Sequence, residues 1–232
     1  MSNNHGDIAI EAPASYKWVE GTLTKITYVA EAGDVKYESL QKAIDAAKSK
    51  AVVTMLADTR ENVTISTPYN GLMLHASAAA LGGRAYLFSG PCGRGKSTHT
   101  RLWQQTFGEA VQVFNDDKPA LRRLDGRWYA YGTPWCGKDG INLNQKWPLG
   151  GICFLEKSQE NRIRRLSAAE ALPLILAQTT YRLPPQYMEL LLASLDSLLR
   201  EIPVFLLENR PEEAAARLSF ETMRRAAEEG GL

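Results

Sequence analysis

One short stretch, GPCGRGKS at residues 90–97, constrains the fold of this 232-residue chain more than any other. It matches the pattern G-x-x-x-x-G-K-[ST] at every fixed position. The apolar run RAYLF (84–88) precedes it, and the helical pattern THTRLWQQTF (98–107) follows it. A glycine-rich turn that matches by chance is the alternative, and it is disfavoured because both flanks also fit. The sequence therefore predicts a strand–loop–helix unit whose loop binds phosphate.

The fixed residues of this loop suit the phosphate chain of a nucleotide. Glycines let successive backbone N–H groups turn toward a phosphate, the Lys96 ammonium reaches the β and γ oxygens, and the Ser97 hydroxyl is a ligand for Mg²⁺. A helix that begins near Ser97 adds the positive end of its dipole. The predicted phosphate-binding residues are Gly90, Pro91, Cys92, Gly93, Arg94, Gly95, Lys96, Ser97 and Thr98.

A second polar cluster, Asn115-Asp116-Asp117, follows the short apolar run VQVF (111–114). A phosphate loop needs a carboxylate that manages the metal ion, usually at the end of a nearby strand. Two adjacent aspartates can divide the work, since one can hold Mg²⁺ while the other accepts a proton from an attacking hydroxyl. A simple Asp-Asp turn is the alternative, and the position after a phosphate loop disfavours it.

The chain from residue 71 onward predicts a mixed sheet. The runs 72–81 and 84–88 are expected to form a hairpin, and so are 120–124 and 127–131, because Gly-Gly and Asp-Gly pairs separate them. Further strands are expected at 111–114, 151–155 and 202–207. Two hairpins beside a strand–loop–helix unit favour a sheet with both parallel and antiparallel pairs.

Helices are predicted mainly in the last third of the chain. Ser167 and Glu170 have capping-box spacing, so a helix is expected through AAEALPLILAQ. Pro184-Pro185 is expected to open a second helix, and Pro211 a polar third. Residues 1–70 differ: YESLQKAIDAAKSK is expected to be a helix between strands at 23–30 and 51–56. We expect this small α+β segment to have a structural or docking role, and residues 71–232 to form the core.

Composition and charge exclude several classes of protein. The formal net charge is +1, from 27 basic and 26 acidic residues, which argues against nucleic-acid and membrane-surface partners. No apolar run approaches the length of about 18 residues that a bilayer requires, and the first residues lack the pattern of a secretory signal. Cys92, Cys136 and Cys153 have no metal-binding spacing and are expected to be reduced thiols. We therefore expect a cytoplasmic protein.

The order of these motifs, LHASAAALGGRAYLFSGPCGRGKST followed by FNDDKPAL, resembles the HPr kinase/phosphorylase and ATP-dependent phosphoenolpyruvate carboxykinase superfamily. Residues 71–155 carry the resemblance, and YGTPWCGK and WPLGGICFLEK look like a divergent, uncharacterised HPr-kinase-related subfamily. The resemblance implies an α/β P-loop kinase core with C-terminal helices.

By the same resemblance, Asp117 would be the general base and Asp116 would hold Mg²⁺ together with Ser97. His75 and Lys96 would support the phosphoryl groups, and the cofactors would be ATP and Mg²⁺. HPr kinases assemble into oligomers, which implies a homo-oligomer here. From the pattern of the run alone, His75 is more simply a structural histidine, and only the family spacing makes the catalytic interpretation equally good. Lys138 is more simply a plain loop lysine than a phosphate contact.

The chain also departs from the HPr kinase pattern. The stretch YGTPWCGKDGIN (131–142) has no glutamate where those enzymes carry a metal-binding one. The run NRIRRL (161–166) could supply a catalytic arginine, but a solvated strand edge is the favoured interpretation.

These observations predict an ATP- and Mg²⁺-dependent kinase that transfers the γ-phosphoryl group to a hydroxyl, with serine of a small protein or peptide as the expected acceptor. Two alternatives stay open: a catalytically weak nucleotide-binding regulatory module, which the missing glutamate favours, and a small-molecule kinase.

Overall fold

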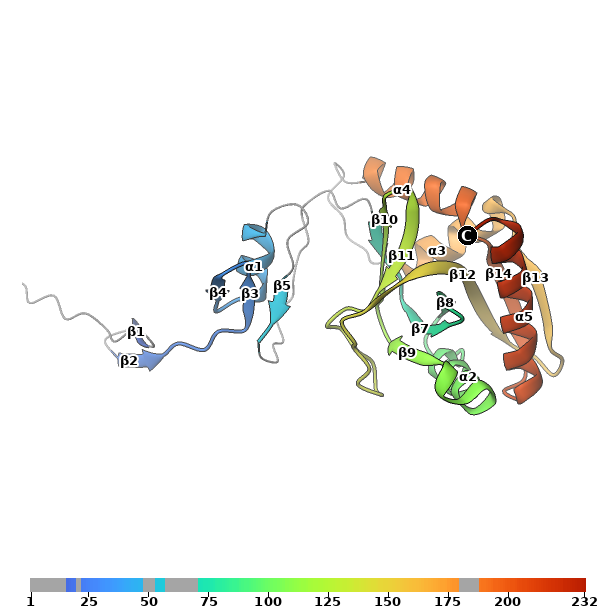
Figure 1. Cartoon of the computed structure of the whole chain (residues 1–232), viewed down its shortest axis with the longest axis horizontal. Helices are drawn as coiled ribbons and strands as arrows, with labels where there is room; N and C mark the ends of the chain where they lie inside the picture. The colour runs from blue at the N-terminus through green and yellow to red at the C-terminus, as the bar shows by residue number, and fades with distance from the viewer. Residues whose placement is uncertain (1–15, 20–21, 48–52, 57–70, 180–187) are drawn as a thin grey trace, which may run out of the picture. The chain divides into compact units, whose positions relative to one another are not determined.

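The computed structural model describes residues 16–19, 22–47, 53–56, 71–179 and 188–232. The chain divides into two compact units, Met1–Thr67 and Pro68–Leu232 (Figure 1). Across the described residues, no helix is both long and apolar enough to cross a membrane.

The described residues of the N-terminal unit form two small sheets and one helix. A hairpin pairs β1 (Tyr16–Val19) with β2 (Thr22–Lys25), and a second sheet has the order β4 (Val35–Tyr37), β3 (Ala30–Ala32), β5 (Val53–Met55). Helix α1 (Leu40–Ala46) begins at Ser39, whose hydroxyl accepts the backbone N–H of Lys42. The strand expected over 23–30 is wrong, because its two ends belong to different sheets, β2 and β3.

A nine-stranded mixed sheet forms the frame of the C-terminal unit. Its strands are β6 (Gly71–Met73), β7 (Ala76–Leu81), β8 (Arg84–Ser89), β9 (Gln112–Asn115), β10 (Ala120–Leu124), β11 (Arg127–Tyr131), β12 (Lys146–Lys157), β13 (Arg162–Arg165) and β14 (Val204–Asn209). The main order is β6-β10-β11-β12-β8-β7-β9, and β14 also pairs with β12 and β13. Strands β8, β12 and β14 run parallel, whereas β7–β8 and β10–β11 are antiparallel hairpins. The predicted mixed sheet is confirmed.

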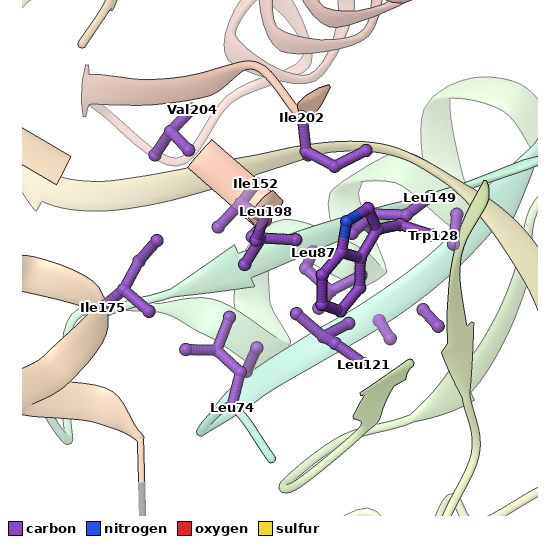
Figure 2. Packing of buried hydrophobic residues seen from close by; sticks show 14 of the residues in the cluster. Leu74, Leu87, Leu121, Trp128, Leu149, Ile152, Ile175, Leu198, Ile202 and Val204 are labelled. Atoms are coloured by element: carbon purple, nitrogen blue, oxygen red, sulfur yellow. The ribbon is translucent and has the colours of Figure 1, made fainter. Parts of the chain in front are cut away.

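Helices cover both faces of the central strands because the side chains of β8 and its neighbours alternate. Phe88 and Cys153 pack with α2 (Lys96–Phe107) and α5 (Glu213–Glu229) in one cluster, which includes Trp103 and Met223. Leu87 and Ile152 point the other way, toward α3 (Ala168–Gln178) and α4 (Met188–Glu201). Figure 2 shows this second cluster, in which Trp128 and Leu198 lie near Leu87 and Ile175 lies at the edge of the group. The two apolar layers hold the start of α2 against the parallel strands.

The structure tests three further predictions made from the sequence. The capping box of Ser167 and Glu170 is present at the start of α3, as predicted. The strand expected over 72–81 is interrupted between β6 and β7, because the backbone N–H of His75 bonds to the Gln178 carbonyl at 2.8 Å instead of to a strand. The run 161–166 contains the strand β13, which pairs only with β14 in the described part of the sheet, so a strand edge was correctly expected. The helix start expected at 184–185 lies outside the described residues.

Candidate functional site

The loop between β8 and α2 has the backbone conformation that its glycines permit. Gly90, Gly93 and Gly95 have φ angles of 137°, 79° and 97°, which side-chain-bearing residues rarely adopt. A Cβ atom at Gly93 or Gly95 would have no neighbour within 4 Å, so the loop is open on that side. The chain therefore leaves the sheet at Ser89, turns through this loop, and enters α2 at Lys96.

Helix α2 begins without a side-chain cap. Its N-cap is Gly95, no side chain accepts a hydrogen bond there, and the first turn contains no acidic residue. The backbone N–H of His99 bonds to the Gly95 carbonyl at 2.8 Å, while the N–H groups of the preceding turn have no intrahelical acceptor. These donors belong to Lys96, Ser97 and Thr98, three of the predicted phosphate-binding residues. The start of α2 thus offers an anion both backbone donors and the positive end of the helix dipole.

The Lys96 ammonium folds back onto its own loop. Nζ donates to the Gly90 carbonyl at 2.8 Å and to the Pro91 carbonyl at 3.2 Å. Partial burial lowers the pKa of Lys96, and the nearby Cys92 thiol and Asp117 carboxylate oppose that shift. The structure therefore places Lys96 and Asp117, predicted from separate motifs, within electrostatic reach of each other.

Asp117 and His75 also come together. His75 Nε2 lies 3.8 Å from Asp117 Oδ1, and Lys118 Nζ lies 3.7 Å from Asp117 Oδ2. The backbone N–H of Ala76 bonds to the Asp117 carbonyl at 2.9 Å, which joins the start of β7 to the chain that follows β9. Both side chains are about a quarter exposed, at 28% for His75 and 25% for Asp117, so the carboxylate remains accessible to a substrate.

Asp116 points into a different environment. It is 5% exposed, and its carboxylate accepts the backbone N–H of Gly137 at 2.7 Å and of Asp139 at 3.0 Å. Asn115 holds the same loop through its side-chain amide, which donates to the Thr133 and Trp135 carbonyls at 3.0 Å each. The aspartate pair thus separates: Asp117 is open beside His75, while Asp116 anchors the loop between β11 and β12. A carboxylate has about four lone-pair positions, so two remain on Asp116 for a metal ion.

The oxygen donors of this site would suit Mg²⁺ only together with the phosphate oxygens of a ligand. In the part of the chain that the structure describes, no three His, Cys, Asp or Glu side chains gather to hold a metal ion. Mg²⁺ usually keeps several waters and takes one or two protein oxygens together with phosphate oxygens. Ser97 at the start of α2 and Asp116 after β9 are oxygen donors of this kind.

Some residues of this site had no sequence signal. Gln178, at the end of α3, contacts His75 from 103 positions away along the chain. Ser89 donates its hydroxyl to the His75 carbonyl at 2.9 Å, and so ties the last residue of β8 to the same histidine. Arg101 on α2 holds Asp139 through two bonds of 2.6 and 2.7 Å. A capping or turn pattern marks none of them, because each contact depends on the fold.

Comparison with known proteins finds a similarity in structure. A scan against protein-family models gives no match, and neither does a search of curated protein sequences. Among solved structures, the chain is similar to the Hpr(Ser) kinase/phosphatase from Coxiella burnetii, with 14% sequence identity and a TM-score of 0.39. The similarity covers 68% of this chain and 90% of that chain. At this TM-score it is a weak likeness of a mixed α/β fold and carries no argument about activity, which has to be argued from the residues of the site.

Proposed function

We propose that the C-terminal unit binds ATP with Mg²⁺ and transfers the γ-phosphoryl group to a hydroxyl, with serine of a small protein or peptide as the acceptor. The observation that carries this proposal is the uncapped first turn of α2, directly beside the Lys96 ammonium and within electrostatic reach of Asp117. A phosphate chain is the ligand that such a set of donors suits best. A carboxylate beside it supplies the base that phosphoryl transfer to a hydroxyl uses.

Each residue has a role in the proposed reaction. The N–H groups of the loop and of the first turn of α2 bind the phosphates, and Lys96 exchanges its bonds to Gly90 and Pro91 for bonds to phosphate oxygens. Ser97 and Asp116 hold Mg²⁺, which neutralises phosphate charge. Asp117 accepts the proton of the acceptor hydroxyl as its oxygen bonds to the γ-phosphorus, while the bond from that phosphorus to the leaving ADP oxygen breaks. Catalysis is then mainly positioning and charge neutralisation.

A regulatory module that binds a nucleotide without an acceptor is the second candidate. The stretch 131–142 favours it, because it has no glutamate where HPr kinases carry a metal-binding one. In that case nucleotide binding would order the loop between β11 and β12, and no transfer would follow. Binding and transfer therefore have to be measured separately.

The first experiment measures thermal unfolding with MgATP. A ligand that binds only the folded state stabilises it by mass action, by about 2.7 kcal/mol when its concentration is about one hundred times Kd. Lys96→Ala should lose most of this stabilisation, whereas Lys36→Ala, which changes an exposed lysine of the N-terminal unit, should keep it. A melting temperature that does not respond to millimolar MgATP would overturn nucleotide binding. Stabilisation without transfer of labelled γ-phosphate to any protein, peptide or water would leave the regulatory module in its place.

A further inference from the structure

Gln178 holds His75 by two hydrogen bonds. Its backbone carbonyl accepts the backbone N–H of His75 at 2.8 Å, and its side-chain Oε1 lies 3.0 Å from His75 Nδ1. With the amide in this orientation, Oε1 can only accept, so the bond requires the proton on Nδ1. The other ring nitrogen, Nε2, faces Asp117 Oδ1 at 3.8 Å.

The element that carries Gln178 is firmly attached at both ends. The capping box of Ser167 and Glu170 closes the start of α3. At its end, the Thr179 hydroxyl donates to the Ile175 carbonyl at 2.7 Å, and Thr179 forms an isolated bridge with Leu74. Gln178 itself is only 9% exposed. Its amide therefore has little freedom to leave the imidazole.

Without Gln178, the ring would favour the opposite arrangement. A neutral imidazole has one N–H, and a neighbouring carboxylate attracts that N–H toward itself. Asp117 alone would therefore place the proton on Nε2. The shorter contact to Gln178 Oε1 competes with this, and it leaves the Nε2 lone pair directed at Asp117.

We propose that Gln178 is a positioning residue that keeps the proton of neutral His75 on Nδ1, so that the lone pair of Nε2 faces Asp117. The consequence for catalysis rests on the proposed kinase function, in which Asp117 takes the proton of the acceptor. The assignment of the ring proton does not rest on that function, because it concerns the tautomer of His75 in the protein without ligands.

The tautomer can be read directly from long-range proton–nitrogen NMR correlations of the histidine rings at about pH 8.5, where an ordinary histidine is neutral. A His75→Gln variant assigns the signals. His99 supplies an internal reference with the opposite tautomer. Asn209 Nδ2, a donor, lies 3.2 Å from its Nδ1, and Ser219 Oγ lies 3.0 Å from its Nε2, so Nε2 carries the proton. We expect Nδ1–H for His75 in the wild type and Nε2–H for His99.

Three variants separate positioning from structure. Gln178→Leu removes the acceptor and should move the His75 proton to Nε2. Gln178→Glu retains an acceptor and should keep Nδ1–H. Thr179→Val removes the neighbouring hydrogen bond to Ile175 without touching His75, and should leave the tautomer as it is. An Nε2–H signal for His75 in the wild type, or a Gln178→Leu spectrum that matches the wild type, would overturn the inference.

Release of labelled phosphate from γ-labelled ATP gives the kinetic readout, with water replacing the acceptor. Gln178→Leu should lower kcat about tenfold, which is the equivalent of about 1.4 kcal/mol for the lost hydrogen bond that orients the ring. The KM for ATP should stay within about twofold, because the phosphate loop is unchanged. An equal loss of kcat in Thr179→Val would show a structural effect and contradict the positioning role. If the tautomers behave as expected and the wild type transfers nothing, the kinase proposal fails while the assignment of the ring holds.

Discussion

The first turn of α2 and the next turn of the same helix differ in how their polar groups are hydrogen-bonded. In the first turn the backbone donors have no side-chain cap, and Lys96 Nζ donates to two carbonyls of its own loop. One turn later, His99 and Trp103 lie fully inside the molecule, and every polar side-chain atom has a partner. Trp103 Nε1 donates to Ser219 Oγ at 2.9 Å, and Ser219 Oγ donates to the Ala216 carbonyl at 2.9 Å.

The difference separates backbone donors that have no side-chain cap from polar groups that are satisfied within the fold. Burial holds the pKa of His99 at about 3, so this ring stays neutral, and Asn209 and Ser219 satisfy both of its nitrogens. Such a network has nothing left to offer a substrate. The first turn of α2, by contrast, has no side-chain cap, which is what the proposed phosphate site needs. Substitutions in the two regions should therefore change different quantities, function in one and stability in the other.

Asp117→Asn should show the largest effect at the open end. The amide keeps the shape but cannot accept the proton of the acceptor, so transfer should fall about a hundredfold or more, a rise of about 2.7 kcal/mol in the barrier. Nucleotide-dependent stabilisation should survive, since Lys96 and the loop are intact. The measurement is the transfer rate with labelled ATP, beside thermal unfolding with MgATP.

The same substitution at two further aspartates provides a control and a contrast for this result. Asp196→Asn changes an exposed residue of α4 in the same way and should leave the transfer rate at the wild-type value. Asp116→Asn should weaken Mg²⁺-dependent nucleotide binding, because a charged oxygen ligand is lost. The reverse pair of results would mean that the two aspartates exchange roles. An unchanged transfer rate in Asp117→Asn would remove the base assignment altogether.

The same substitution at two serines tests the comparison directly. Ser219→Ala deprives two buried N–H donors, on His99 and Trp103, of their acceptor, and should lower the free energy of unfolding by about 2 to 3 kcal/mol. Ser97→Ala should change that free energy by less than about 0.5 kcal/mol and weaken Mg²⁺-dependent nucleotide binding instead. Urea unfolding and nucleotide titration of both variants provide the measurements. Equal losses of stability would show that the start of α2 is as much part of the core as the network is.

How far the sequence predicts these two regions depends on the range of the contacts that build them. The phosphate loop and the capping box of α3 have local signals, because their residues lie within one or two turns of one another along the chain. The sheet alternation is predictable for the same reason. His75, Lys96 and Asp117 were expected to cooperate through a family resemblance, not through any spacing of their own.

The remaining features depend on contacts between distant parts of the chain. The break between β6 and β7 occurs because the Gln178 carbonyl captures the His75 N–H, and no propensity near residue 75 indicates it. His99 lies in a helical pattern that favours burial, yet its partners Asn209 and Ser219 are 110 and 120 positions away. Asp116 looks equivalent to Asp117 in sequence, and only the returning loop at Gly137 distinguishes the two. Such partners become visible only once the sheet brings the segments together.

The pH dependence of the free energy of unfolding tests the buried network around His99. The pKa of His99 is about 3 in the folded protein and about 6.5 when the chain is unfolded. Between these values the unfolded state binds more protons, so stability is complete above pH 6.5 and falls as the pH falls toward 3. The free energy of unfolding changes by up to about 1.4 kcal/mol per pH unit for one such group. His99 alone should therefore lower it by about 2 kcal/mol between pH 8 and pH 5.

A His99→Gln variant isolates this contribution, because glutamine retains hydrogen-bonding groups but does not titrate. Urea unfolding at several pH values should give a curve for His99→Gln that is flatter than the wild-type curve between pH 5 and pH 6.5, and parallel to it above pH 7. If His99→Gln keeps the wild-type slope between pH 5 and pH 6.5, the ring of His99 is not held neutral by burial in the folded protein, and the assignment of the second turn of α2 to the buried network is wrong.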